Sequence, residues 1–521
     1  MLSGCGGQDM DVPAGEEKEP EETPFSRLLT NQKLESKILK RSLDYAVLLP
    51  DGYDVSTDTY PVVYLLHGYG DDETAWYQGG GLRYNVDKNE DVAVPMIYVM
   101  PQGFNTYYIN KYNGKFPYMD MFVKELVPTI DSLFRTKKNK TQRAVMGYSM
   151  GGYGALILPV MNPDVFSVSI PLSMSFRTRD QYLEETQGAF DIQWAPNFGP
   201  RVGASGESRF SDYYKEHSPF YFFDTDEISR FDGLKILIDC GDDEESLSKT
   251  NNEMHVLLRD HNIAHEYRVR SGAHSWNYWK EAYPEALAFI SDAVQQFEYP
   301  EEPEPVMIDP LITVDDFQTI DVPGTHTSVN LLLPAQYSDD EAYPVVYFLN
   351  DHESEGRVDN TIKVFSLLTN AMTNDRIEKS ILVEISAELA TRENLPLADI
   401  IAYVDQEYKS AKSTKGRLLI GNGHGAALAL EVSNDLSDLL INCFAFNPKF
   451  SSEMPKHNDK AFYYLDMTDE ASGYKIANGF YLQMRSGEYE YRVRQGTETV
   501  QSFLNGLDQS LKEMKAKLKS E

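Results

Sequence analysis

Cysteine is scarce in this sequence, because its 521 residues include only Cys5, Cys240 and Cys443. Three cysteines so far apart exclude a disulfide framework and a cysteine-based zinc site. Long apolar runs are also missing: no stretch reaches the ~18 consecutive apolar residues that a membrane-spanning helix requires. The sequence therefore predicts a body that does not cross a bilayer.

Basic residues are the second shortage. The chain has 48 Lys and Arg against 81 Asp and Glu, a formal net charge of −33. This balance excludes nucleic acid and anionic lipid surfaces as expected partners. The 41% hydrophobic content is that of a globular protein. Because a single core stops growing near roughly 250–300 residues, we expect two domains.

The start of the chain gives the only indication of cellular location. Leu2 to Cys5 read LSGC, which resembles the lipobox whose cysteine carries the lipid in bacterial lipoproteins. The basic and apolar segments that usually precede a lipobox are missing, so an accidental match is the alternative. Residues 1–24 are otherwise acidic and contain little apolar content, as in a solvated tether. We expect an extracytoplasmic lipoprotein whose membrane contact is a lipid anchor at Cys5.

The chain contains an internal repeat. Similar segments recur in the same order in both halves: YPVVYLL (60–66) and YPVVYFL (343–349), RAVMGYSMGGYGAL (143–156) and RLLIGNGHGAALAL (417–430), EYRVRSG (266–272) and EYRVRQG (490–496). We therefore expect two copies of one fold. The boundaries are a first domain over 25–297, a Pro/Glu linker over 298–306 and a second domain over 307–521.

Short apolar runs alternate with helical stretches in each half. Four of them, Val62 to Leu66, Ile97 to Met100, Ala144 to Met146 and Lys235 to Ile238, are continuous and not strictly alternating. Such runs indicate strands buried on both faces of a parallel sheet. We predict a doubly wound α/β fold, whose functional sites lie beyond the carboxyl ends of the strands.

A G-x-S-x-G sequence follows the third of these strands. Gly147 to Gly151 read GYSMG and precede a predicted helix. The glycines permit a sharp turn that presents Ser149 at the start of the helix, the arrangement of a nucleophile elbow. The alternative is a tight turn with a passive serine.

A serine nucleophile needs a base and donors for a developing oxyanion. His274 directly follows the predicted strand Glu266 to Arg270, and is the candidate base. The expected oxyanion donors are the backbone N–H groups of Met150 and Tyr69. For His67, beside Tyr69, we weigh a role in shaping the turn against one in substrate binding.

Four motifs, YLLHGYG, GYSMGGYGA, IDCGDDEESL and GAHSWNYW, resemble those of the esterase D and feruloyl esterase family of α/β-hydrolases. The resemblance implies Ser149 as nucleophile, His274 as base, and Tyr69 and Met150 as oxyanion donors. The family's acid is an aspartate about four residues after the cysteine of a CG turn, where this chain has Glu244. Asp243 and an acid from elsewhere remain alternatives.

The second half lacks each catalytic residue type. In the internal alignment Gly423 takes the place of Ser149, Glu498 that of His274, and Ala471 that of Glu244. We therefore expect a degenerate, pseudoenzyme copy of the hydrolase fold.

The first half is longer than the second between elbow and acid, and the extra residues fall in 174–223. This aromatic-rich segment stands where hydrolases insert lids. Most of its aromatic residues are expected to form a small core, and Trp194 is our candidate for contact with substrate.

These observations predict a serine carboxylesterase that needs no metal or cofactor. The resemblance implies feruloyl or acetyl esters of plant cell-wall polysaccharide as substrates. Two alternatives stay open: an acyltransferase with the same triad, and a non-catalytic binding or scaffold protein made of two hydrolase folds. The sequence does not indicate an oligomeric state.

Overall fold

A computed structural model of the protein describes residues 27–300, 302–351, 357–386, 395–450 and 454–519. Cys5 and the acidic segment 1–24 lie outside these residues, so the lipid anchor stays a prediction. Among the described residues, no helix combines the length and the apolar character needed to cross a membrane.

The first half forms a twisted sheet in the order β1-β2-β4-β3-β5-β6-β7-β8. Strand β1 is antiparallel to β2, and β2 is antiparallel to β4. The strands from β4 to β8 are parallel to one another. The strands are β1 (Arg27–Ser36), β2 (Arg41–Leu49), β3 (Val62–Leu66), β4 (Ile97–Pro101), β5 (Arg143–Tyr148), β6 (Val168–Leu172), β7 (Lys235–Gly241) and β8 (Glu266–Arg270). The doubly wound α/β prediction is confirmed.

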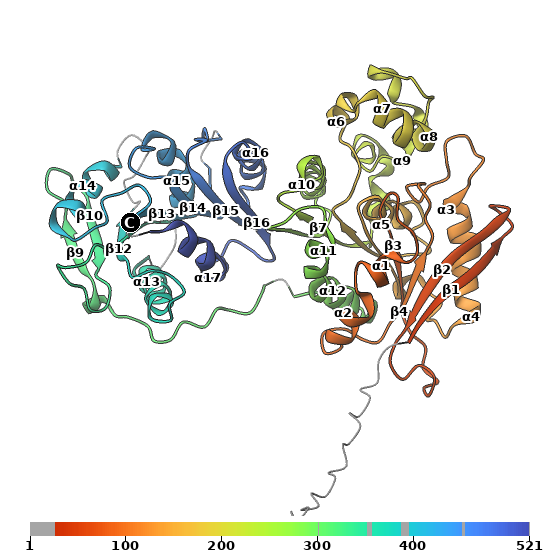
Figure 1. The fold of residues 1–521 in the computed structure, drawn as a ribbon, viewed down its shortest axis with the longest axis horizontal. Coiled ribbons are helices and arrows are strands. Elements are labelled where there is room, and N and C mark those ends of the chain that lie inside the picture. Colours follow the sequence, from red (N-terminus) through yellow and green to blue (C-terminus); the bar gives the residue numbers. More distant parts are fainter. Residues whose placement is uncertain (1–26, 301, 352–356, 387–394, 451–453, 520–521) are drawn as a thin grey trace, which may run out of the picture.

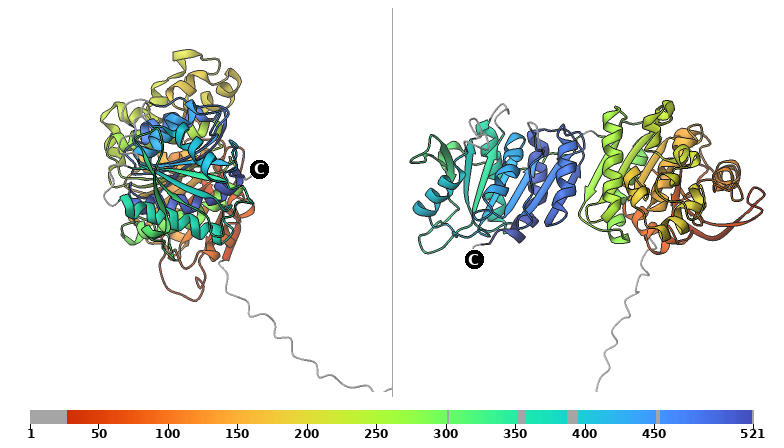
Figure 2. Two further views of the ribbon diagram at one scale, coloured as in Figure 1. Left: turned by 90° about the vertical axis from the view of Figure 1, so that its left-hand side faces the viewer. Right: turned by 90° about the horizontal axis from the view of Figure 1, so that it is seen from above.

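Helices cover both faces of this sheet (Figures 1 and 2). Alternate residues of β3 enter opposite cores: Tyr64 packs into the core that contains α5, and Leu65 into the core that contains α12. A continuous apolar run satisfies both cores at once. The helices are α1 (Ala75–Gln78), α2 (Leu82–Lys88), α3 (Tyr118–Met121), α4 (Val127–Leu133), α5 (Met150–Met161), α6 (Arg179–Glu184), α7 (Gln187–Ala189), α8 (Ala195–Phe198), α9 (Asp212–His217), α10 (Glu245–Asp260), α11 (Trp276–Glu281) and α12 (Tyr283–Gln295).

The second half repeats this strand order as β9-β10-β12-β11-β13-β14-β15-β16, which is the order that the internal repeat predicts. Its strands are β9 (Gln318–Asp321), β10 (Ser328–Leu332), β11 (Val345–Asn350), β12 (Ile381–Ser386), β13 (Arg417–Asn422), β14 (Asn442–Phe446), β15 (Phe462–Thr468) and β16 (Glu488–Arg494). Its helices are α13 (Arg357–Thr373), α14 (Leu397–Glu407), α15 (His424–Asp435), α16 (Tyr474–Met484) and α17 (Val500–Lys517).

The two halves meet edge to edge. Strands β8 and β16, which carry the repeated EYRVR sequence, pair antiparallel at Val269 and Val493. Within the described residues the two sheets therefore form one sheet of 16 strands, and Figure 1 shows the two halves side by side. Antiparallel pairing of equivalent strands gives the junction an approximate two-fold symmetry. Its ion pairs follow that symmetry: Arg492 contacts Asp242 at 2.8 Å, and Arg268 contacts Asp469 at 2.6 Å.

The junction is therefore built from strand pairing and buried charges. The segment that joins the halves is also tied down, because the Glu302 carboxylate accepts a hydrogen bond from the Thr497 N–H at 2.8 Å. Val306 N–H donates to the Asn505 side chain at 2.7 Å. These contacts favour a fixed connection over a free linker.

Ending the chain after Pro303 is expected to lower the melting temperature of the first half by about 5–10 °C. The cut removes the strand that pairs with β8 and the partners of Asp242 and Arg268. A net hydrogen bond is worth about 1 kcal/mol, and each kcal/mol shifts the melting temperature of a domain this size by about 2–4 °C. Calorimetry of residues 25–303 beside the full chain measures the difference. Equal melting temperatures would show that the junction does not stabilise the first half.

Candidate active site

Ser149 occupies the turn between β5 and α5, where the sequence predicts a nucleophile. Its backbone lies at φ 57° and ψ −119°, a conformation that costs a non-glycine residue about 1–3 kcal/mol. The Ser149 N–H donates to the Leu172 carbonyl at 3.0 Å. A Cβ atom on Gly147 would lie 2.2 Å from the Gly151 carbonyl oxygen, so the turn needs glycine there. The result is a strained, half-buried serine at the amino-terminal end of a helix.

The two predicted oxyanion donors lie at the same edge of the sheet as Ser149. Met150 is the first residue of α5, so its N–H is one of the helix-start amides without an intrahelical acceptor. Tyr69 follows β3, whose last residue, Leu66, is in register with Gly147 of β5. The Gly70 N–H donates to the Asn105 side chain at 2.8 Å and fixes the loop that carries Tyr69.

His67 is a structural residue of this loop. Its ring is 1% exposed, with Nδ1 2.8 Å from the Gly68 carbonyl and Nε2 2.7 Å from the Gly103 N–H. These contacts fit a neutral ring that donates through Nδ1–H and accepts at Nε2. Burial lowers the pKa of His67 below its usual value, which favours the same neutral form. The substrate-binding alternative for His67 is not supported, because the ring is enclosed.

Glu244 is the carboxylate that contacts His274. Its Oε2 lies 2.7 Å from His274 Nδ1, and its Oε1 accepts a hydrogen bond from the Gly241 N–H at 3.1 Å. The Glu244 side chain has no exposed surface, whereas 38% of the His274 side chain is exposed. A buried carboxylate thus fixes one nitrogen of an imidazole whose other side is open to solvent.

Asp243, the alternative acid, points away from this pair. It is exposed, and its carboxylate lies 3.3 Å from the Tyr489 hydroxyl of the second half. Its N–H donates to the Gly272 carbonyl at 3.1 Å. The backbone of the turn therefore directs the side chains of Asp243 and Glu244 to opposite sides.

Two further residues support Glu244, one directly and one through the other, and the sequence analysis identified neither. Ser173 donates its hydroxyl to Glu244 Oε1, and Trp279 Nε1 donates to the Ser173 hydroxyl at 2.8 Å. The Trp279 ring also packs edge-on against His274, with ring centroids 4.9 Å apart. Ser173 follows β6 directly, and β6 packs beside β7. Only that strand pairing brings it to the acid, so no spacing in the sequence could have identified it.

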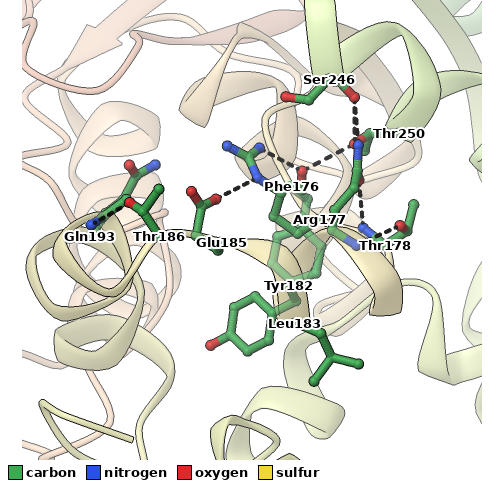
Figure 3. Close-up of polar contacts among 12 residues, drawn as sticks. Phe176, Arg177, Thr178, Tyr182, Leu183, Glu185, Thr186, Gln193, Ser246 and Thr250 are labelled. Atoms are coloured by element: carbon green, nitrogen blue, oxygen red, sulfur yellow. Dashed lines mark hydrogen bonds and ion pairs between the residues drawn. The ribbon is translucent and has the colours of Figure 1, made fainter. Parts of the chain in front are cut away.

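The insertion over 174–223 forms helices α6 to α9, which project from the sheet in Figure 1. Its base is fixed to α10, where the Thr250 hydroxyl donates to the Phe176 carbonyl at 3.2 Å. Arg177 bonds the same carbonyl at 3.0 Å and the Glu185 carboxylate at 2.8 Å (Figure 3).

Trp194 does not reach a binding surface, contrary to our expectation. It is 0% exposed, and its ring centroid lies 5.1 Å from that of Tyr107 and 5.7 Å from that of Phe176. A large apolar ring gains most from such burial, so Trp194 belongs to the core of the insertion.

The equivalent turn of the second half keeps the elbow geometry without a side chain. Gly423 lies between β13 and α15 at φ 58° and ψ −122°, within a few degrees of Ser149. The Glu498 carboxylate, at the position of His274, accepts a hydrogen bond from the Ser472 N–H at 2.7 Å. Ala471, at the position of Glu244, is buried and apolar.

Gly423→Ser is expected to create no reactive serine and to destabilise the second half by about 1–3 kcal/mol. A Cβ atom on Gly423 would lie 2.2 Å from Asp351 Oδ2, so Asp351 must move. Melting temperature and fluorophosphonate labelling of the Ser149→Ala/Gly423→Ser double variant measure both effects. Covalent label on residue 423 would contradict the expectation.

Comparison with known proteins gives a family for the first half. A family model described as "Putative esterase" matches residues 36–290. A protein of Xylanibacter ruminicola named endo-1,4-beta-xylanase/feruloyl esterase is 35% identical over 129 residues, which are 23% of this chain and 18% of that protein. An acetyl esterase of Caldicellulosiruptor saccharolyticus is 24% identical over 280 residues, 49% of this chain and 95% of the relative.

Among solved structures, a ferulic acid esterase aligns with a TM-score of 0.44 and 25% identity, over 52% of this chain and all of that one. The match to the Xylanibacter ruminicola protein spans less than a fifth of that protein's length. Residues 36–290 of this chain belong to the esterase family that the matching model describes.

Proposed function

We propose that the first half is a serine carboxylesterase that works through an acyl-enzyme. The observation that carries this proposal is the buried contact of Glu244 with His274, at the sheet edge where Ser149 directly precedes α5. The Ser149 hydroxyl attacks the ester carbonyl, and His274 Nε2 takes its proton and returns it to the leaving alcohol. In the second step water attacks the acyl carbonyl and gives a proton to His274 Nε2, which passes it to the Ser149 oxygen as the acyl bond breaks and the free acid leaves.

Glu244 orients the ring and stabilises the imidazolium that forms in each step. The N–H groups of Tyr69 and Met150 receive the negative charge that develops on the carbonyl oxygen. The positive end of the α5 helix dipole, where Met150 lies, adds a favourable field. All of these groups come from the first half.

We propose feruloyl or acetyl esters of plant cell-wall polysaccharide as the substrates. The names of two relatives, a xylanase/feruloyl esterase and an acetyl esterase, support this class. A lipid anchor at Cys5, followed by the acidic segment, would hold the enzyme at the cell surface where such polymers are met.

The glutamate at position 244, where the family has an aspartate, is the feature of the sequence that favours a non-catalytic binding protein. Because Glu244 contacts His274 at 2.7 Å, that feature no longer counts against catalysis. For the second half we propose a degenerate copy without chemistry of its own. Gly423 provides no nucleophile, Glu498 stands where the imidazole base would be, and Ala471 provides no acid to orient it.

A panel of methyl ferulate, acetylated xylan and p-nitrophenyl acetate tests the proposal on the full chain. We expect free acid from at least one ester with the wild type and none above background with Ser149→Ala. Transfer of the acyl group to an added alcohol, without free acid, would indicate an acyltransferase. No turnover of any ester, at any pH from 5 to 9, would contradict the proposed function.

A further inference from the structure

The turn that carries Glu244 is held from outside by the second half. Asp242 is 1% exposed. Its Oδ1 accepts the Gly272 N–H at 3.0 Å, two residues before His274. Its Oδ2 accepts the Tyr491 N–H at 3.0 Å and Arg492 Nη1 at 2.8 Å, both from β16. One carboxylate thus connects the acid turn, the histidine loop and the second half.

The backbone of the turn has partners in the second half as well. The Asp242 carbonyl accepts hydrogen bonds from the hydroxyls of Tyr481 at 2.6 Å and Tyr489 at 3.2 Å. Arg485 donates to the Glu245 carbonyl and to the Ser248 hydroxyl. Asp242, Asp243 and Glu245, the residues on either side of Glu244, are therefore all bonded to groups of α16, Arg485 or β16.

This turn is one that needs external support. Glu245 lies at φ 33°, a strained value for a non-glycine residue. Burial raises the pKa of Asp242 to about 6, and the charge of Arg492 opposes that rise. Without Arg492 a buried carboxylate would lack a counter-ion, which is costly. The second half thus supplies the counter-ion of Asp242 and the hydrogen bonds that hold the strained backbone of the turn.

We propose that the second half holds the catalytic acid in place, with Arg492 and Tyr481 as positioning residues for Glu244. This inference rests on the proposed esterase function and gives the degenerate half a role in the reaction. Neither residue touches substrate. They act by fixing Asp242, which precedes Glu244 by two residues and contacts the His274 loop.

The symmetry of the junction offers a matched control. Asp469 of the second half accepts the Tyr267 N–H at 3.2 Å, the Gly496 N–H at 3.0 Å and Arg268 at 2.6 Å. These are the counterparts of the Asp242 contacts, but the turn after Asp469 contains Ala471 in place of an acid. Arg492→Met and Asp469→Asn each remove one of the two equivalent ion pairs, and both substitutions lie in the second half, so that the sequence of the first half is unchanged.

In the full chain we expect Arg492→Met to lower kcat at least tenfold with KM changed less than twofold, because only the orientation of the acid is affected. Asp469→Asn should keep the kcat and KM of the wild type. Equal kcat values for the two variants, whether both normal or both low, would overturn the inference.

A second substitution decides the matter if Arg492→Met fails to fold. Tyr481→Phe removes a single hydroxyl from the Asp242 carbonyl, and Tyr474→Phe, at the other end of α16, removes one that contacts Asp260 away from the acid turn. We expect a fall of threefold or more in kcat, with KM changed less than twofold, for Tyr481→Phe alone. Wild-type values for it would overturn the inference. Absence of hydrolysis in the wild type would instead refute the proposed function.

Discussion

Ser149→Ala is expected to lower kcat by about four to six orders of magnitude while the melting temperature stays at or slightly above that of the wild type. The residue provides the bond-forming oxygen, and the other groups act on that oxygen or on the charge it creates. Alanine also keeps the hydrogen bonds that the backbone of residue 149 makes, so the substitution should not destabilise the fold. Steady-state hydrolysis of an activated ester, with calorimetry of the same samples, measures both quantities.

His274→Ala serves as the companion to this variant. Because nucleophile and base act as a unit, the loss in His274→Ala should nearly equal that in Ser149→Ala, and the double variant should lose little more. If the loss of kcat in the double variant equals the product of the two single losses, Ser149 and His274 do not act as a unit. Near-normal turnover in either single variant would remove that residue from the mechanism.

Glu244→Gln is expected to lower kcat by about three to four orders of magnitude. The amide keeps the size of the side chain but cannot stabilise the imidazolium, and its NH₂ group faces His274 Nδ1 or the Ser173 hydroxyl in place of an acceptor. Asp243→Asn is the matched control, since it makes the same chemical change one residue earlier on an exposed side chain. We expect it to change kcat by less than about threefold.

The pair of variants also tests the backbone register of the turn. Both should keep the far-ultraviolet circular dichroism spectrum of the wild type, so that kinetic losses report chemistry. A severe loss in Asp243→Asn with a mild one in Glu244→Gln would mean that the turn is shifted by one residue in solution. Mild losses in both would place the acid elsewhere.

The strands of the sheet are predictable because each is marked by a run of residues within the strand itself. The run at Val62 to Leu66 matches β3 to the residue. Strands buried on both faces need apolar side chains at every position, and few other elements produce such runs. The elbow was also predictable, because its strained turn admits only glycine at close contacts such as Gly147.

Contacts made across the fold were not predictable in this way. The choice between Glu244 and Asp243 depends on how the turn packs against the Gly272 loop. The order of acidic residues along the turn does not show this packing. The sequence makes Trp194 a candidate for contact with substrate, whereas the structure buries it, because aromatic content cannot distinguish a small core from a binding face. Ser173 reaches the acid only through the pairing of β6 with β7.

The junction shows the same limit at a larger scale. The repeated EYRVR segments were visible in the sequence, and they indicated equivalent strands. That these strands pair with each other, and that Arg492 reaches Asp242, follows from the arrangement of the two halves. A repeat predicts that two folds are alike, but not which edges they present to one another.

Labelling of the full chain with a fluorophosphonate tests the central claim most directly, because the reagent reacts rapidly only with a serine that a base activates. We predict one covalent adduct per chain, located on Ser149 by peptide mapping, and no adduct in the Ser149→Ala or His274→Ala variants. An unlabelled wild type, or an adduct on any other residue, would contradict the account.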